Sequence, residues 1–289
     1  MGLLHVYHLL GDYLHDFVEK LPTIALNDGG SPTIHTSLNQ AGGWEEAGER
    51  EAPSTGRMSS SDPNLMQIPK RLHKMAQGIR RAFKARLGYV WVSADIAQEE
   101  PRLAAAPSGD MTMLEEFNTG VDVYMEIAHM VKRAVTRDPR ARATRKEVDP
   151  WGLEYRDTAK NKVFLPRLYG GGAEKVASLH AGLTRASAGA ILKAFDAKYP
   201  GVARYAKRVE VEVTAQGYVT TQFGRRRRLP GIWASPQTQG GREQRSAALR
   251  MAVNHPIQGT GADILKGTLV RLFGAGGALV GKAHLLFPV

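Results

Sequence analysis

Three carboxylates in one short stretch could bind a metal ion. Asp95, Glu99 and Glu100 follow Tyr89–Ser93, an aromatic and β-branched run that predicts a short buried strand. A carboxylate at the end of a strand is rigidly placed and faces solvent or a ligand, which suits a metal site. Asp95 could instead cap the helix that residues 103–106 indicate, and the stretch alone gives both interpretations equal weight.

A second group of residues could bind a triphosphate. Arg156, Lys160 and Phe164 are spaced four apart, so on a helix they drift by only about 40° per step and share one face. Two cations and an aromatic ring could hold phosphates with a base stacked on the ring. They could equally form a charged surface stripe, with Phe164 in the core. Pro166 must disturb this helix, because it lacks an N–H and clashes with the carbonyl of residue 162.

Polar side chains elsewhere have the spacing or setting of a nucleic-acid contact. Arg250, Asn254 and Gln258 are again four apart, in a helix predicted over 242–252 that Pro256 and Gly259 should interrupt before it resumes over 262–273. The interruption points the amides into a site or marks a kink. Arg57 lies in a turn-forming segment, 54–69, whose composition favours a surface turn over a contact with a nucleic-acid backbone or groove.

The composition limits the class of protein. The chain has 289 residues with 43% hydrophobic content, and 39 Lys and Arg against 28 Asp and Glu give a net charge of +11. This charge favours a polyanionic partner, nucleic acid before an anionic membrane surface. No run of roughly 18 apolar residues predicts a membrane span, and residues 1–10 lack the features of a signal peptide. The absence of Cys excludes disulfides and thiolate metal sites.

Mostly helical elements must position these residues. Beyond the strand and helices already given, the pattern predicts helices over 3–20, 113–131 and 156–169, further helices over 173–213 with a break at 199–201, a hairpin over 217–225 and a buried strand over 282–289. Residues 132–150, dense in Arg and Lys, are expected to form an exposed, mobile connection.

Six motifs in order resemble the polymerase domain of family A DNA polymerases, the polymerase I type, including its bacteriophage members. They cover most of residues 30–289: TGRMSSSDPNLMQIP (55–69), SADIAQEEPRLAA (93–105), DVYMEIA (122–128), RDTAKNKVFLPRLYGGG (156–172), KYPGVARYAKRVEVEVTAQGYVTTQFGRRRRLP (198–230) and NHPIQGTGADILK (254–266).

The resemblance implies an α+β, right-hand polymerase fold of palm and mostly helical fingers. It implies a residual thumb-type helix over 1–30, palm over 31–125, fingers over 126–235 and a second part of the palm over 236–289. The implied partners are primer–template DNA and dNTPs. A monomer in the cytoplasm of a bacterial or phage-infected cell is expected.

The implied reaction is attack of a primer 3′-hydroxyl on the α-phosphate of a nucleotide. By resemblance, Asp95 bridges two Mg²⁺ ions and the backbone carbonyl of Ile96 is a further ligand. Glu100 matches a steric gate against a ribose 2′-hydroxyl, which favours DNA over RNA synthesis. Gln98 and Arg102 match positions beside the nucleotide and primer.

The resemblance also gives roles to the predicted cationic helix. Arg156 and Lys160 match cations on the triphosphate, with Lys160 as general acid for pyrophosphate; Phe164 matches the ring beside the incoming sugar and base. Tyr169 matches a tyrosine that stacks at the template position, but the family's Lys-to-Tyr separation is one residue shorter. The extra residue would rotate Tyr169 by about 100° on a regular helix, and a π-bulge would restore its direction.

Contacts with DNA are implied at two further places. Arg57 matches a minor-groove reader at the primer terminus, with Asn64 beside it, and Arg250, Asn254 and Gln258 match residues that follow the template and the terminal base pair. Because minor-groove acceptors are nearly the same for all correct pairs, donors there test pair geometry without reading sequence.

In this family a strand like LLFPV leads into a His-Asp-Glu turn that carries a second metal-binding aspartate, and this sequence ends at Val289 before it. A fragment with little primer-extension activity is therefore expected. A non-catalytic module that binds primer–template DNA or nucleotide is the alternative, since the basic residues, including Arg225–Arg228, support it equally. A single-subunit RNA polymerase is a weaker alternative, against which Glu100 argues.

Overall fold

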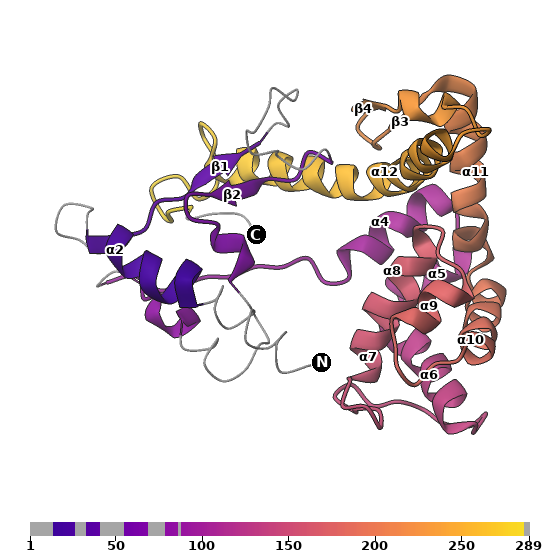
Figure 1. The fold of residues 1–289 in the computed structure, drawn as a ribbon. Coiled ribbons are helices and arrows are strands. Elements are labelled where there is room, and N and C mark those ends of the chain that lie inside the picture. The colour runs from indigo at the N-terminus through magenta and orange to yellow at the C-terminus, as the bar shows by residue number, and fades with distance from the viewer. Residues whose placement is uncertain (1–13, 27–32, 41–54, 69–78, 86–87, 286–289) are drawn as a thin grey trace. The chain divides into compact units, whose positions relative to one another are not determined.

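The computed structural model describes residues 14–26, 33–40, 55–68, 79–85 and 88–285 (Figure 1). Its chain forms two compact units, residues 1–95 with 270–289, and residues 96–269. The first eleven residues of the predicted helix over 3–20 and the last four of the predicted strand over 282–289 lie outside the described residues.

The first unit has a small apolar core between short elements. A π-helical turn, η1 (Leu14–Glu19), runs into α2 (Lys20–Leu26), and a 3-10 turn, η2 (Leu65–Gln67), follows the second of two short strands. These strands, β1 (Ser37–Asn39) and β2 (Ser59–Ser61), pair antiparallel. The core joins residues from the helix, the turn and the segments around them: Leu21, Leu65 and Ile68 are buried, with Phe17, Ile34, Ile79 and Phe83 packed against them.

The predicted strand over 89–93 is wrong. Residues 89–93 have no regular secondary structure, and Val90 and Val92 are each 84% exposed. A strand is held by the hydrogen bonds of a neighbouring strand, and no described strand pairs with this run. The described part of the second predicted strand, Ala283–Leu285, is likewise exposed and irregular, although the ring of His284 lies 5.6 Å from that of Tyr89.

The second unit is mostly helical. Its elements are α4 (Glu99–Ser108), α5 (Met111–Asn118), α6 (Val123–Thr136), α7 (Tyr155–Thr158), the π-helical turn η3 (Ala159–Phe164), α8 (Leu165–Leu168), α9 (Ala173–Ser178), α10 (Arg185–Lys198), α11 (Pro200–Gln216), β3 (Tyr218–Thr220), β4 (Arg226–Arg228), the 3-10 turn η4 (Pro230–Trp233) and α12 (Gln239–Phe273), whose last residues belong to the first unit. Strands β3 and β4 pair antiparallel, which confirms the predicted hairpin with its second strand slightly later. One core contains buried side chains of α5, α6, η3, α10, α11 and α12.

The helix predicted over 113–131 is two helices, because two aspartates start new ones. Asp110 and Asp122 precede α5 and α6, and their carboxylates accept from the backbone N–H of Met113 at 3.0 Å and of Tyr124 at 3.1 Å. Gly120, with φ of +78°, takes the left-handed conformation that commonly follows a helix end. The caps therefore divide an apolar pattern that is continuous in sequence.

The predicted exposed connection over 132–150 is largely anchored. Helix α6 continues to Thr136, and the Lys132 and Arg133 side chains donate to the carbonyls of residues 142 and 141. Ala143 is buried, and buried Asp149 lies 2.6 Å from the Nε2 atom of His180. Two of the segment's cations thus hold its backbone in place.

The predicted interruption of the last helix is also wrong, since α12 is continuous from Gln239 to Phe273. Two of its glycines admit close neighbours. A Cβ at Gly259 would lie 2.7 Å from Thr221 Cγ2, and one at Gly261 would lie 2.7 Å from Glu99 Oε1. Within the ranges described, no helix is both long and apolar enough to cross a membrane.

Candidate functional site

The chain from α7 to α8 contains the π turn that the extra residue predicts. The N–H of Leu165 donates to the carbonyl of Lys160, five residues back, and the N–H of Tyr169 then donates to the carbonyl of Leu165 at 3.1 Å, four residues back. Pro166 explains the position of this turn, because it can neither donate to residue 162 nor pack against its carbonyl in a regular α-helix. One extra residue is thereby absorbed without ending the helical segment.

Two cations lie on the face of a buried aromatic ring at the start of this segment. The Arg156 Cζ atom is 5.3 Å and the Lys160 Nζ atom 5.8 Å from the centroid of Tyr124. Arg156 Nε also donates to Asp122 Oδ2 at 2.8 Å. Burial, and then the carboxylate of Glu100, raise the pKa of Tyr124 far above its usual value, so the phenol stays neutral. The neutral Tyr124 ring contacts both cations, and the Asp122 carboxylate orients Arg156.

Phe164 belongs to the core. Its side chain is fully buried, with edge-on contacts to Tyr124 at 5.6 Å and Phe195 at 6.1 Å between ring centroids. Of the two interpretations open for this residue, core packing is the one that the structure shows. Its predicted contact with an incoming nucleotide stays a prediction, and its ring meets the same Tyr124 ring as the two cations.

Three predicted site residues from three helices meet through hydrogen bonds. Tyr169, at the end of α8, donates its hydroxyl to Glu100 Oε1 of α4 at 3.3 Å. Gln258 of α12 donates its amide to the same oxygen at 3.2 Å and lies 3.5 Å from the Tyr169 hydroxyl. After the π turn, Tyr169 therefore points toward Glu100, and its predicted place beside the templating base stays a prediction.

Two further predicted site residues, Gln98 and Arg102, flank Glu100 in the sequence. Gln98 directly precedes the helix in a left-handed conformation, with φ of +54°, and its buried Oε1 atom has no hydrogen-bond partner among the described residues. Arg102 donates to the carbonyl of Ala97 at 2.9 Å, and its guanidinium stacks 4.6 Å from the ring of Phe117. The cation is thus held along the helix surface.

Arg250, Asn254 and Gln258 lie on one continuous helix, as their spacing requires. Arg250 is exposed and donates to Ser246 Oγ at 2.6 Å. The buried Oδ1 atom of Asn254, like the Oε1 atom of Gln98, lacks a donor within the described part of the chain. Since an unpaired buried acceptor is costly, each marks a position where a donor from water or a ligand would be stabilised.

Arg57 and Asn64 belong to the first unit and are half-buried. Asn64 Oδ1 accepts from Ser60 Oγ at 3.0 Å, and Ser60 Oγ accepts in turn from the N–H of Met66 at 3.2 Å. The asparagine therefore stabilises its own turn, the surface turn that the composition favours.

The predicted metal ligands are at the boundary of the two units. Asp95 is exposed and Ile96 is 48% exposed. Over the residues that the structure describes, no group of three His, Cys, Asp or Glu side chains is placed to hold a metal ion. These residues alone do not complete the predicted two-ion site.

The spacing of the motifs did not reveal the role of one carboxylate, that of Asp122. Asp122 caps α6 with Oδ1 and orients Arg156 with Oδ2. Its signal in the sequence is an Asp directly before an apolar helical run, which indicates an N-cap. The second task depends on packing α6 against α7, and helix periodicity does not report that packing.

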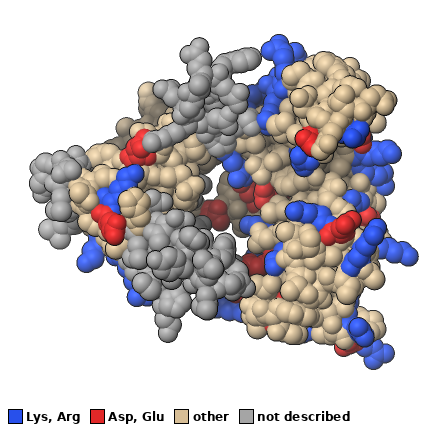
Figure 2. Space-filling view, viewed as in Figure 1, with Lys and Arg blue, Asp and Glu red and all other residues tan. Residues whose placement is uncertain are grey.

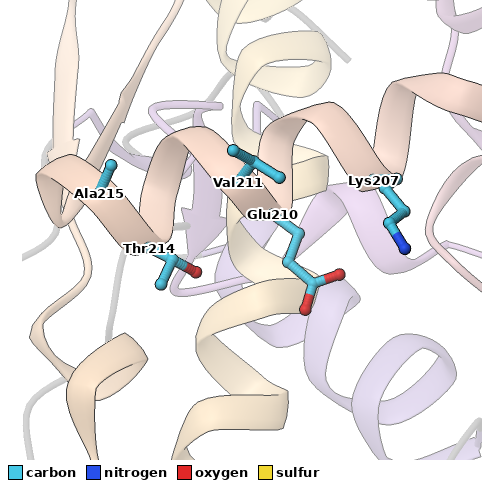
Figure 3. Close-up of a pocket in the computed structure, with 5 residues that line it drawn as sticks. All are labelled: Lys207, Glu210, Val211, Thr214 and Ala215. Atoms are coloured by element: carbon cyan, nitrogen blue, oxygen red, sulfur yellow. The ribbon is translucent and has the colours of Figure 1, made fainter.

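One pocket among the described residues lies apart from the predicted site residues. A pocket on α11 is lined by Lys207, Glu210, Val211, Thr214 and Ala215, all from that one helix and none of them a predicted site residue (Figure 3). On the face of Figure 2, Lys and Arg side chains are scattered among acidic and uncharged residues.

Comparison with known proteins agrees with the motif order. A family model described as DNA polymerase family A matches residues 2–289. The thermostable DNA polymerase I of Thermus filiformis is 34% identical over 98% of this chain and 30% of its own length, and that of Thermus aquaticus is 35% identical over 89% and 27%.

A solved structure of the POL domain of Pol1 from M. smegmatis, in complex with DNA primer-template and dNTP, is similar with a TM-score of 0.71 and 31% identity. The match covers 92% of this chain and 41% of that one. The chain thus spans about 30% of the length of its curated relatives. The match over nearly the whole sequence, together with the similar fold, shows that the chain belongs to DNA polymerase family A.

Proposed function

We propose that this chain is part of an enzyme of template-directed DNA synthesis, which transfers a nucleotide from a dNTP to a primer 3′-hydroxyl. Family membership supports the proposal, and the similar structure from M. smegmatis is a complex with both primer-template DNA and dNTP. The observation that carries it is the pair of cations, Arg156 and Lys160, held over Tyr124 at one end of a helical segment whose other end meets Glu100 and Gln258.

The cations bind and polarise the triphosphate. Arg156, oriented by Asp122, contributes a fixed positive group, and Lys160 contributes a mobile ammonium. Charge develops on the leaving pyrophosphate as its bond to the α-phosphate breaks. A Lys160 ammonium beside that oxygen stabilises the charge and can donate its proton as a general acid.

The three-helix contact positions the sugar end of the nucleotide. Glu100 is held by Tyr169 and Gln258, and a fixed side chain there excludes a 2′-hydroxyl more effectively than a mobile one. Tyr169 lies toward the templating base, with Gln98 and Arg102 beside the nucleotide and primer. On this assignment residues 126–235 form fingers and the flanking segments form palm.

The remaining assignments concern DNA and metal. Arg57 and Asn64 contact the primer end in the minor groove, and Arg250, Asn254 and Gln258 follow the template. Family A polymerases use Mg²⁺, for which Asp95 and the carbonyl of Ile96 are the proposed ligands. A bound Mg²⁺ ion would lower the pKa of the attacking hydroxyl and neutralise phosphate charge.

Nucleotide binding tests the proposal directly. Anisotropy of a fluorescent dNTP, titrated in the presence of primer–template DNA, should show saturable binding that Lys160→Ala weakens about 10-fold to 100-fold, because a charge-assisted hydrogen bond contributes roughly 1.5–3 kcal/mol. Lys193→Ala, on an exposed position of α10, should leave the affinity unchanged. Equal losses in the two variants would contradict the proposed triphosphate site.

Primer extension in the presence and absence of Mg²⁺ separates catalysis from binding. Metal-dependent extension that Asp95→Asn abolishes would support the enzyme. Tight binding of primer–template DNA and dNTP without extension, also by the full-length protein, would favour the non-catalytic binding module instead.

A further inference from the structure

Residues 137–146, named here the basic loop, carry five cations and one acid in the sequence RDPRARATRK. All five cations are exposed: Arg137, Arg140, Arg142, Arg145 and Lys146. Among the residues that the structure describes, none of these five side chains takes part in a hydrogen bond or an ion pair. Their charges are therefore available to a partner outside the chain.

The acids in and beside the basic loop are occupied by the chain itself. Asp138 and Glu147 each accept a backbone N–H at 2.9 Å, and Glu147 also pairs with Lys132. Asp149 is fully buried against His180. No carboxylate of this segment is thus left to neutralise the exposed cations, and the loop presents a net positive surface.

The backbone of the basic loop is held on α6. Lys132 and Arg133 donate to the carbonyls of residues 142 and 141, and the N–H of Ala143 donates to His129 Nδ1 at 3.0 Å. The side chain of Ala143 is buried, which places this part of the loop against the core. Because its backbone is fixed before a partner binds, the loop loses less conformational freedom on binding than a mobile segment would.

An exposed aromatic ring follows the basic loop. Val148 and Glu154 pair antiparallel, and Trp151, between them, is 46% exposed. Its indole packs on Gly182, where a Cβ would lie 2.2 Å from the ring, and it meets the His180 ring edge-on at 5.4 Å between centroids. The ring is thus fixed on one side and leaves nearly half of its surface for stacking with a base.

Helix α6 separates the basic loop from the proposed triphosphate cations. Those cations lie over Tyr124, in the first turn of α6. The loop begins after Thr136, twelve residues further on, which is about 18 Å along the helix axis. None of the DNA contacts proposed above belongs to the loop.

We propose that the basic loop and Trp151 form a second DNA site, which binds single-stranded DNA while primer–template DNA occupies its own site. Four of the five loop cations are arginines, whose planar groups bind phosphate through two hydrogen bonds. A single strand offers phosphates and unstacked bases together, which cations beside an exposed indole recognise. Duplex DNA presents only base edges, and an acidic peptide has no base to stack. This site goes beyond the proposed function, since it needs neither dNTP nor a primer terminus.

Anisotropy of a fluorescent oligo(dT) of about 12 nucleotides tests the second site, with and without saturating unlabelled primer–template DNA that has a one-nucleotide overhang. Binding to the unmodified chain should persist when the primer–template is present. For single strands, log K changes with log salt by about −0.7 for each phosphate neutralised. The triple variant Arg140→Ala, Arg142→Ala and Arg145→Ala should therefore bind oligo(dT) about 100-fold more weakly at about 0.1 M NaCl, with a salt slope shallower by about 2. Its affinity for the primer–template should be unchanged.

A control variant removes the same charge elsewhere. Lys193→Ala, Arg204→Ala and Lys207→Ala, exposed on α10 and α11, should together change oligo(dT) binding less than about twofold. Trp151→Leu keeps an apolar side chain on Gly182 but has no ring, so it should weaken binding about fivefold or more and leave the salt slope unchanged.

Three results would overturn the second site. They are complete displacement of oligo(dT) by the primer–template, equal losses in the two triple variants, and unchanged binding by Trp151→Leu. Competition by polyglutamate as strong as that by unlabelled oligo(dT) would assign the surface to an acidic protein partner instead. Loss of primer–template and dNTP binding, with oligo(dT) binding by the loop intact, would refute the proposed function and leave the second site in place.

Discussion

Asp110 joins the beginnings of two helices that are far apart in the sequence, and its removal should be severely destabilising. Its Oδ1 atom accepts from the N–H of Met113 at 3.0 Å, which caps α5. Its Oδ2 atom accepts from the N–H groups of Gly201 at 2.7 Å and Val202 at 3.3 Å, in the first turn of α11. The carboxylate is 2% exposed and serves two helix N-termini, each of which favours a negative charge.

The cost of Asp110→Ala follows from the groups left behind. Loss of the cap on α5 costs about 1 kcal/mol. The N–H groups of Gly201 and Val202 are in buried residues, and a buried donor left without an acceptor costs roughly 1–3 kcal/mol. Allowing for partial relaxation, the free energy of unfolding should fall by about 3–5 kcal/mol.

Urea denaturation followed by far-UV circular dichroism at pH 7 measures this loss. The matched control is Asp138→Ala, because exposed Asp138 also accepts a backbone N–H, that of Arg140 at 2.9 Å, and its loss should cost less than about 1 kcal/mol. Asp110→Asn keeps one carbonyl acceptor and should fall between the two. If Asp110→Ala and Asp138→Ala lose the same stability, the two-helix role of Asp110 is refuted.

Two further predictions concern the packing between the hairpin and α12. Burial, and then the charge of Arg225, lower the pKa of His255 to about 4, against about 6.5 in an unfolded chain. Between these two pH values the unfolded state binds more protons than the folded state. The free energy of unfolding should therefore fall by about 2–3 kcal/mol as the pH drops from 7.5 to 4.5. His255→Leu should remove most of that loss in urea melts at the two pH values, and an unchanged pH dependence would contradict it. Gly259→Ala should destabilise the protein by about 1–3 kcal/mol in thermal melts, because the new Cβ would meet Thr221 and Arg225. The control, Gly267→Ala, lies in open space on the same helix and should stabilise the protein by up to about 1 kcal/mol. The opposite order of stability would count against close packing as the reason for glycine at 259.

Local signals predicted the elements that local chemistry determines. The break at Tyr199–Gly201, the hairpin and the stop after Tyr169 all follow from Pro, Gly and turn residues, and the structure has each of them. The π turn was also predictable, because one extra residue had to be accommodated beside Pro166. In each case the deciding interaction lies within a few residues of the chain.

The predictions that were wrong depend on distant neighbours. The apolar run over 89–93 has the composition of a strand, but a strand also needs a hydrogen-bonded partner, and composition does not supply one. Glycine at 259 predicts a break when read alone, whereas in the fold it admits the side chain of Thr221 against a continuous helix. The same residue types have opposite meanings according to what packs against them.

In the candidate site, too, some features could be predicted from nearby residues and others could not. Spacing placed Arg156 and Lys160 on one face correctly, and Phe164 contacts the same Tyr124 ring although the π turn spans Ala159–Phe164. The bond from the N–H of Leu165 to the carbonyl of Lys160 spans five residues, so spacing by four no longer applies beyond this turn. The direction of a later residue such as Tyr169 therefore depends on the backbone hydrogen bonds and not on the motif alone.

Glu100 shows why the register after the π turn matters for function. Its Oε1 atom accepts from both Tyr169 and Gln258, so α8 and α12 together position a carboxylate of α4. Without the π turn, the extra residue would rotate Tyr169 by about 100° and remove one of the two donors. The proposed sugar selectivity at Glu100 therefore depends on a backbone irregularity several residues before Tyr169.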